Sequence, residues 1–172
     1  NWCADYTVFV GTWLTELKCW KKNIRTPFEI ILNGSDNKIF NSKGYKYWEK
    51  KEPLKLVTHH WGGNWMKGFD IYSKIDQMLN TKTWKSKISF TYIGNLPKDF
   101  HFKNVNYIKP LDGLELAKEI KKHHVYLTAS INEPGGNHQN EGALCGLPLL
   151  YRNSGCMPEY CRGFGIMFDK KD

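Results

Sequence analysis

Two glutamates, Glu133 and Glu141, lie eight positions apart and enclose the glycine-rich segment Pro134-Gly-Gly-Asn-His-Gln-Asn140. An apolar run typical of a buried strand, 125–129, precedes them, and Glu141 falls in the first turns of an expected helix. Such a strand, glycine loop and helix N-terminus bind anions, because unpaired backbone N–H groups and the helix dipole face the loop. Carboxylates repel phosphate but accept hydrogen bonds from hydroxyl groups. The pattern therefore predicts a ligand with a diphosphate and hydroxyls, such as a nucleotide sugar.

Lys67 precedes Gly68, where another helix is expected to begin. An ammonium group in this position can contact a diphosphate that the helix dipole also favours. When a phosphate leaves, negative charge builds on it, and a fixed cation stabilises that transition state more than the ground state. Lys67 is therefore the first candidate for a rate-determining contact; the alternative is a surface lysine on a turn.

Gly62 and Gly63 follow the apolar run 54–58 at the point where open α/β sheets gather their ligands. Glycines allow close backbone approach, so a phosphate could lie against them, although paired glycines are also common in turns. His59 and His60 could add a cation below about pH 6.5, or could be structural histidines. Aromatic residues beside glycine turns more often pack than bind ligands, so Trp61 and Trp65 are expected to pack.

Apolar runs of strand length alternate with helical patterns, which is typical of a parallel α/β sheet. Ile71, Ile75, Met78 and Leu79 are expected to share one face of a helix over 70–79, and Leu114, Ala117 and Ile120 one face of a helix over 114–122. Right-handed crossovers would place helices on both sides of the sheet. The fold class is therefore α/β, a Rossmann-like, doubly wound parallel sheet. Strands are expected over 7–10, 28–32, 54–58, 88–93, 105–108, 125–129, 148–151 and 166–168.

The segment 33–53 interrupts this alternation with turn residues and lysines and carries no long apolar run. It indicates a linker between two α/β units. Residues 1–34 are therefore expected to be the tail end of an N-terminal Rossmann-like domain with its hinge. Residues 35–172 are expected to form a C-terminal domain, truncated at its own C-terminus because no helix follows 166–168.

The chain has 172 residues, a net charge of +8 and no apolar run long enough to span a membrane. Five scattered cysteines without CxxC spacing argue against a disulfide framework or a zinc site and favour a reducing cytoplasm. The charge favours acidic partners, whether nucleotide diphosphates, anionic lipids or nucleic acid. Much of the positive charge lies in short clusters that are expected to be solvated faces, such as Lys121-Lys122 and Lys170-Lys171.

Five segments, in this order, resemble the retaining, nucleotide-sugar-dependent glycosyltransferases of family 4, which have two facing Rossmann-like domains, the GT-B fold. They are Asn33-Gly-Ser-Asp36 with Phe40, Lys67-Gly68, Glu133 to Glu141, Ala143 to Pro148, and Ser154-Gly155 with Glu159. The resemblance identifies the chain chiefly as the C-terminal, donor-binding domain. It departs from the family at Trp61, where an Arg commonly stands six residues before the Lys.

The resemblance implies that Glu133 binds the donor sugar's hydroxyls at the reacting carbon, and that Glu141 accepts from the ribose hydroxyls. Lys67 would stabilise the leaving phosphate, and the backbone near Ile108 would hold the nucleobase. The glycine loop would present its backbone N–H groups to the sugar and the phosphate through Gly135, Gly136, Asn137, His138 and Gln139. No metal is expected, because no DxD pattern occurs.

The expected function is therefore transfer of a sugar from a nucleotide diphosphate, with retention, to a saccharide, lipid-linked or other acceptor. A facing N-terminal domain would supply the acceptor site, so the chain alone could bind donor without turnover. A cytoplasmic location, with peripheral contact at the inner membrane face, and no nucleic-acid partner are expected. The alternatives are a nucleotide-sugar epimerase of similar build, a donor-sensing subunit without activity, and a basic nucleic-acid-binding domain, although no RNP-like or helix-turn-helix signature occurs.

Overall fold

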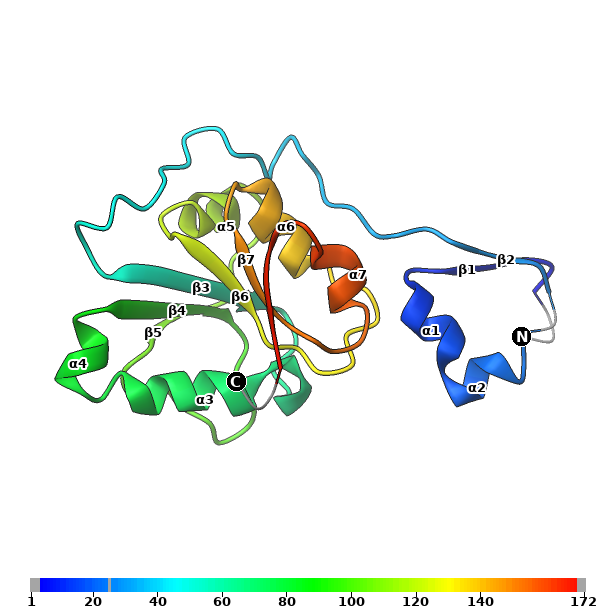
Figure 1. The fold of residues 1–172 in the computed structure, drawn as a ribbon, viewed down its shortest axis with the longest axis horizontal. Helices are drawn as coiled ribbons and strands as arrows, with labels where there is room; N and C mark the ends of the chain where they lie inside the picture. Colours follow the sequence, from blue (N-terminus) through cyan, green and yellow to red (C-terminus); the bar gives the residue numbers. More distant parts are fainter. Residues whose placement is uncertain (1–3, 25, 170–172) are drawn as a thin grey trace.

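The computed structural model describes residues 4–24 and 26–169 (Figure 1). Cys3 and the Lys170-Lys171 cluster lie outside these described residues. The main body is a six-stranded parallel sheet in the order β5-β4-β3-β6-β7-β8. Its strands are β3 (Leu54–His60), β4 (Ile88–Gly94), β5 (Asn106–Ile108), β6 (Val125–Thr128), β7 (Leu149–Arg152) and β8 (Gly165–Phe168).

The strand order reverses between β3 and β6. The chain first builds β3, β4 and β5 outward in one direction and then returns to add β6, β7 and β8 on the other side of β3. This is the Rossmann order, and it leaves a crevice at the carboxyl ends of β3 and β6, where α/β sheets bind ligands. The prediction of a Rossmann-like, doubly wound parallel sheet is therefore confirmed.

Helices cover both faces of the sheet (Figure 1). The short η1 (Trp65–Lys67), α3 (Phe69–Met78) and α4 (Lys82–Lys85) lie on one side. On the other side lie α5 (Gly113–Ile120), α6 (His138–Leu144) and α7 (Met157–Cys161). Neighbouring residues of one strand supply both cores: Leu56 packs in the α3-side cluster, and Val57 in the cluster of α5, α6 and α7. This alternation explains why the strands read as continuous apolar runs.

Two helix faces differ from the sequence prediction. In α3 the most buried side chains are Phe69, Tyr72 and Asp76, whereas Ile71 and Ile75 only border the core. The Asp76 carboxylate is buried because it accepts hydrogen bonds from the backbone N–H groups of residues 103, 104 and 105 at 2.7–3.2 Å. In α5 Leu114 is 60% exposed, so the prediction that it shares the buried face is wrong.

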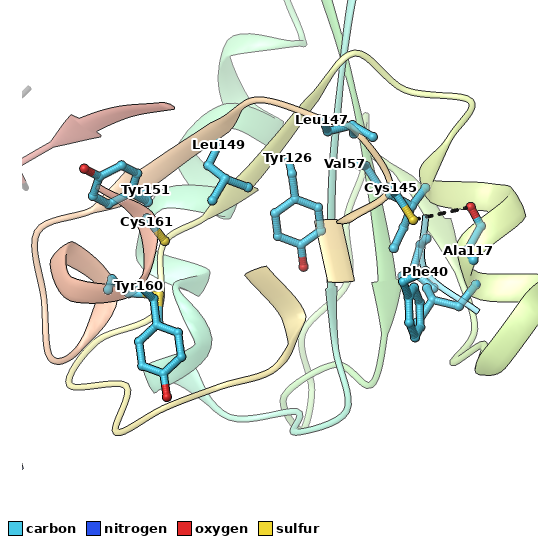
Figure 2. Packing of buried hydrophobic residues seen from close by; sticks show 14 of the residues in the cluster. Phe40, Val57, Ala117, Tyr126, Cys145, Leu147, Leu149, Tyr151, Tyr160 and Cys161 are labelled. Atoms are coloured by element: carbon cyan, nitrogen blue, oxygen red, sulfur yellow. Dashed lines mark hydrogen bonds between the residues drawn. The ribbon is translucent and has the colours of Figure 1, made fainter. Parts of the chain in front are cut away.

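The core cluster of α5, α6 and α7 includes Cys145, which is fully buried (Figure 2). Its Sγ lies 3.9 Å from the Ala117 carbonyl oxygen, so α6 and α5 contact each other over this small side chain. Burial raises the pKa of the Cys145 thiol to about 11, which keeps it protonated and unreactive.

The N-terminal residues form a separate unit, in which β1 (Thr7–Phe9) and β2 (Phe28–Ile30) pair in parallel around α1 (Thr12–Glu16) and α2 (Lys18–Lys21). The unit lies beside α7 of the main body (Figure 1). The Tyr160 hydroxyl donates to the Val10 carbonyl at 2.6 Å, and the Thr12 hydroxyl donates to Glu159 at 2.6 Å. The boundary at residue 34 between two domains stays a prediction.

The segment 31–53 contains no helix or strand and runs across the main body to the start of β3 (Figure 1). The Tyr45 hydroxyl anchors it by donating to the His124 carbonyl at 3.1 Å. Among the described residues, no helix is long and apolar enough to cross a membrane.

Candidate functional site

A cleft of about 420 Å³ lies at the carboxyl ends of β3 and β4, next to the reversal of strand order. Of the predicted site residues it is lined by His59, His60, Gly62, Lys67, Gly136, Asn137, His138 and Glu141. Three separate stretches of the chain therefore meet here: the end of β3, the η1 turn and the start of α6. The sheet topology gathers these residues, which the sequence spreads over more than eighty positions.

The position of Lys67 is fixed by its neighbours on both sides. The Asn64 side chain accepts the Met66 backbone N–H at 3.0 Å and so caps η1. Gly68 has a left-handed φ of 97°, and a Cβ there would lie 2.6 Å from the backbone of Ala129 at the end of β6. Only glycine tolerates both conditions, so the Lys-Gly pair holds the lysine against the end of the sheet.

The Lys67 ammonium pairs with the Glu133 carboxylate at 2.8 Å. The Glu133 side chain is 7% exposed and that of Lys67 is 25% exposed. Glu133 does not line the main cleft; with Lys67 it lines an adjoining cavity of about 380 Å³. Lys67 borders both spaces, so it can reach a ligand in the cleft while its present partner stands beside it.

The loop that carries Glu133 is held by the stretch 154–156. The Cys156 N–H donates to the Glu133 carbonyl at 2.8 Å, and the Ser154 hydroxyl accepts the Asn132 N–H at 2.8 Å. Gly155 has a φ of 61°, and a Cβ there would lie 2.5 Å from the Glu133 backbone. The Ser-Gly pair noted in the sequence therefore positions Glu133.

Glu141 is tied to the end of β3 through His59. The His59 Nε2 lies 2.7 Å from the Glu141 carboxylate, and its Nδ1 lies 2.9 Å from the Tyr126 hydroxyl. This chain of contacts orients one carboxylate oxygen of Glu141 inside the cleft. The other oxygen can accept hydrogen bonds from a ligand.

His60 and His138 lie against each other, with ring centroids 4.6 Å apart. Burial holds the pKa of both imidazoles well below the usual range, and the neighbouring His59 and Lys67 lower both pKa values further. Both rings are therefore neutral near pH 7. The surroundings of His60 favour the alternative of a structural histidine, because its ring is buried and contacts the Tyr72 hydroxyl at 2.8 Å. A contact between His60 and phosphate stays a prediction.

Four residues that were predicted to bind the ligand pack against other parts of the protein. Gly63 lies against residue Leu96, whose carbonyl oxygen would be 2.5 Å from an added Cβ. Ile108 packs against the core, and Gly135 abuts Val10 of the N-terminal unit. The Gln139 side chain is buried and donates to the Gly136 carbonyl, which shapes the glycine loop. These four residues do not line the cleft.

Trp61 and Trp65 were both expected to pack, and the structure differs from this prediction at Trp61. Trp61 is 75% exposed and lines the cleft, so the prediction for it is wrong. Trp65 is 53% exposed, but its ring makes edge contacts with Phe69 and Phe100. Trp61 occupies the position where an Arg was noted as common, and it adds an aromatic surface there instead of a charge.

The sequence interpretation missed part of the cleft wall. Phe40 and Asp112 line the cleft, from the irregular segment 31–53 and from the turn before α5. Asp112 had a signal in the sequence, because an Asp-Gly pair follows the β5 run and precedes a helical pattern. Among residues 4–24 and 26–169, no group of three His, Cys, Asp or Glu side chains is placed to hold a metal ion. Independence of metal stays a prediction.

No protein-family model and no curated protein matches the chain. Solved structures do match its fold. WaaG, a glycosyltransferase involved in lipopolysaccharide biosynthesis, is 16% identical with a TM-score of 0.68, over 95% of this chain and 49% of that one. The trehalose-6-phosphate synthase OtsA is 13% identical with a TM-score of 0.72, over 98% and 49% of the two chains.

The pneumococcal O-GlcNAc transferase GtfA, solved in complex with UDP and GlcNAc, is 18% identical with a TM-score of 0.71, over 98% and 35% of the chains. The present chain thus spans about half the length, or less, of these proteins. At such low identity the likeness establishes the fold: a Rossmann-like domain of the GT-B type, consistent with its C-terminal domain. Membership of family 4 stays a prediction.

Proposed function

We propose that the chain is the donor-binding part of a retaining glycosyltransferase that takes a sugar from a nucleotide diphosphate. The observation that carries the proposal is the cleft at the reversal of strand order, which places the Lys67 ammonium and the Glu141 carboxylate around one space of about 420 Å³. A cation suits a diphosphate and a carboxylate suits vicinal hydroxyls. The shared fold with sugar-transferring enzymes supports the proposal.

Lys67 exchanges partners in this proposal. Without donor it is paired with Glu133 at 2.8 Å. When the diphosphate enters the cleft, the ammonium contacts the phosphate, and the Glu133 carboxylate becomes available to the sugar hydroxyls. As the bond from sugar to phosphate breaks, the negative charge grows on the phosphate, where Lys67 stabilises it.

Glu141 and the start of α6 hold the rest of the donor. Asn137 makes no side-chain capping bond at the N-terminus of α6, so the first N–H groups of this helix are available to a ligand. Gly136 brings the backbone close to both Glu133 and His138, since a Cβ there would lie 3.1 Å and 2.6 Å from their side chains. Glu141 accepts from the ribose hydroxyls while His59 holds it.

The acceptor, a sugar or a lipid-linked molecule, binds to a facing N-terminal domain in this proposal, and no metal takes part. The departing phosphate helps to remove the acceptor's proton on the same face of the sugar, which gives retention. The enzyme acts in the cytoplasm. A chain that lacks the facing domain binds donor without turnover.

A thermal-shift panel of nucleotide sugars tests the proposal. UDP- or GDP-sugars should raise the melting temperature, whereas the free sugars should not. A flat response to the whole panel would reject the proposal. With the complete protein, product analysis then separates transfer to an acceptor from epimerisation, which would convert free donor into a new sugar nucleotide.

A further inference from the structure

A cavity of about 540 Å³ lies at the opposite end of β3 from the cleft, and we call it the lysine cavity. Five lysines and two glutamates line it: Lys46, Lys51, Lys55, Lys121 and Lys122 with Glu49 and Glu52. Lys55 stands at the start of β3, and His59 and His60 stand at its end. The lysine cavity and the cleft are therefore separate sites.

Both glutamates of the lysine cavity already have partners. Glu49 pairs with Lys51 at 2.7 Å, and Glu52 pairs with Lys55 at 2.6 Å. Within the described part of the chain, Lys46 and Lys121 make no ion pair with a carboxylate; Lys121 donates to the Lys43 carbonyl at 3.1 Å. The cavity therefore keeps an excess of positive charge and suits an anion.

An apolar cavity of about 470 Å³ adjoins the lysine cavity and shares Tyr47 and His124 with it. Its wall includes Trp48, which stacks on His124 with ring centroids 6.2 Å apart, and Phe164. Tyr47 is 81% exposed and Phe164 is 65% exposed. Exposed aromatic side chains beside a cationic surface are typical of proteins that bind at the interface of a bilayer.

The segment 31–53 builds much of both cavities. Irregular segments of this length are uncommon in compact domains and are usually either functional loops or linkers. This one is fixed at both sides of the lysine cavity, since Tyr45 donates to the His124 carbonyl at 3.1 Å and Lys121 donates to the Lys43 carbonyl. It therefore presents Lys46, Tyr47 and Trp48 in a defined arrangement.

We propose that the lysine cavity and the apolar cavity together bind anionic phospholipid at a membrane surface. The lipid phosphate lies among the lysines, and Tyr47 and Phe164 enter the interfacial region below the headgroups. Anionic leaflets attract clustered lysines in this way. Free phosphate would use the charge but leave the apolar half unexplained. A single strand could stack its bases on the aromatic side chains, so an oligonucleotide is included in the test. The membrane lies at the opposite end of the sheet from the cleft, which stays open.

Vesicle co-sedimentation of the whole chain tests the proposal, with phosphatidylcholine vesicles and vesicles that also contain phosphatidylglycerol. The test variant is the triple Lys46→Gln, Lys51→Gln, Lys122→Gln, whose side chains are exposed and whose loss should not unfold the chain. The matched control is Lys74→Gln, Lys98→Gln, Lys103→Gln, which removes the same charge from exposed positions outside the lysine cavity. Circular dichroism verifies that both triples remain folded.

The chain should bind the anionic vesicles and not the neutral ones. The test triple should lose about 100-fold in partition coefficient, at about 5-fold for each lysine, and the control should lose far less. The pair Tyr47→Ser, Phe164→Ser should weaken binding about 10-fold without changing its dependence on salt. Equal losses in both triples, or no binding to anionic vesicles, would overturn the proposal. So would a test triple that loses affinity for a single-stranded oligonucleotide but not for vesicles.

Discussion

Lys67 and Glu133, 66 positions apart in the sequence, form an ion pair of 2.8 Å at the border between the cleft and the adjoining cavity. The pair joins the η1 turn to the loop after β6, and both partners are held by glycines that no other residue could replace without strain, Gly68 and Gly155. Because this ion pair borders the cleft, the ammonium and the carboxylate can each form a new contact when a ligand binds. The proposed donor binding depends on this exchange.

Lys67→Ala should weaken binding of a nucleotide sugar about 10- to 100-fold, because one charge-assisted hydrogen bond to the diphosphate is lost. Lys67→Arg should lose less, since the charge remains. Isothermal titration measures both, with Lys74→Ala on the exposed side of α3 as the control. An unchanged dissociation constant in Lys67→Ala would remove Lys67 from the donor site.

Glu141→Gln should weaken donor binding about 10-fold, because an amide accepts fewer hydrogen bonds from vicinal hydroxyls than a carboxylate. The loss should depend on the ribose. A nucleotide that lacks both ribose hydroxyls should bind the wild type and Glu141→Gln almost equally. If this analogue shows the same loss as the natural nucleotide, Glu141 does not contact the ribose.

The stability of the fold should decrease as the pH falls below about 6.5. The pKa values of His60 and His138 are held well below the usual range by burial, so the folded chain keeps both neutral while the unfolded chain protonates them. The unfolded state then binds more protons, and the free energy of unfolding falls by at most about 1.4 kcal/mol per pH unit for each histidine.

Urea unfolding at pH 5.5, 6.5 and 7.5 measures this dependence. The destabilisation by the two histidines should be small above about pH 6.5 and grow toward pH 5.5. His60→Gln should reduce the slope whatever its effect on stability at pH 7.5. A slope that is the same in wild type and His60→Gln would show that His60 does not contribute.

Gly68→Ala should destabilise the fold by about 2–4 kcal/mol, because a left-handed residue gains a Cβ that meets backbone. That Cβ would lie 2.6 Å from Ala129 at a φ of 97°. Gly34→Ala is the control, since a Cβ there meets nothing within 4 Å. Urea unfolding compares the two variants. Equal free energies of unfolding would mean that the η1 turn can shift to accommodate the Cβ without loss of stability.

The fold could be predicted from the sequence because both faces of the sheet are covered. A strand buried on both faces reads as a continuous apolar run, which applies to β3, β4, β6 and β7. All eight expected strands are present, although β2 and β8 are largely exposed. Helix faces were predicted less well, because the rule that buried means aliphatic fails in α3. There Tyr72 and Asp76 are buried because hydrogen bonds satisfy their polar atoms. The periodicity of apolar residues cannot identify polar residues that are buried in this way.

The residues of the candidate site could be predicted only where a short sequence motif identifies them. The Lys-Gly pair and the two glutamates carry local signals, and the structure brings Lys67 and Glu141 to the same cleft. The neutral state of His60 could not be predicted, since it depends on burial under His138, which lies 78 positions away. The exposure of Trp61 likewise depends on what the surrounding loops leave uncovered.

The most direct test of the proposed donor site is a titration of the ¹⁵N-labelled chain with UDP- and GDP-sugars, followed by amide chemical shifts. If the proposal holds, the shifts concentrate at the cleft, on Gly62, Lys67, Gly136, His138 and Glu141, and leave the lysine cavity unchanged. Shifts confined to Lys46, Lys121 and their neighbours, or no shifts with any nucleotide sugar at millimolar concentration, would contradict it.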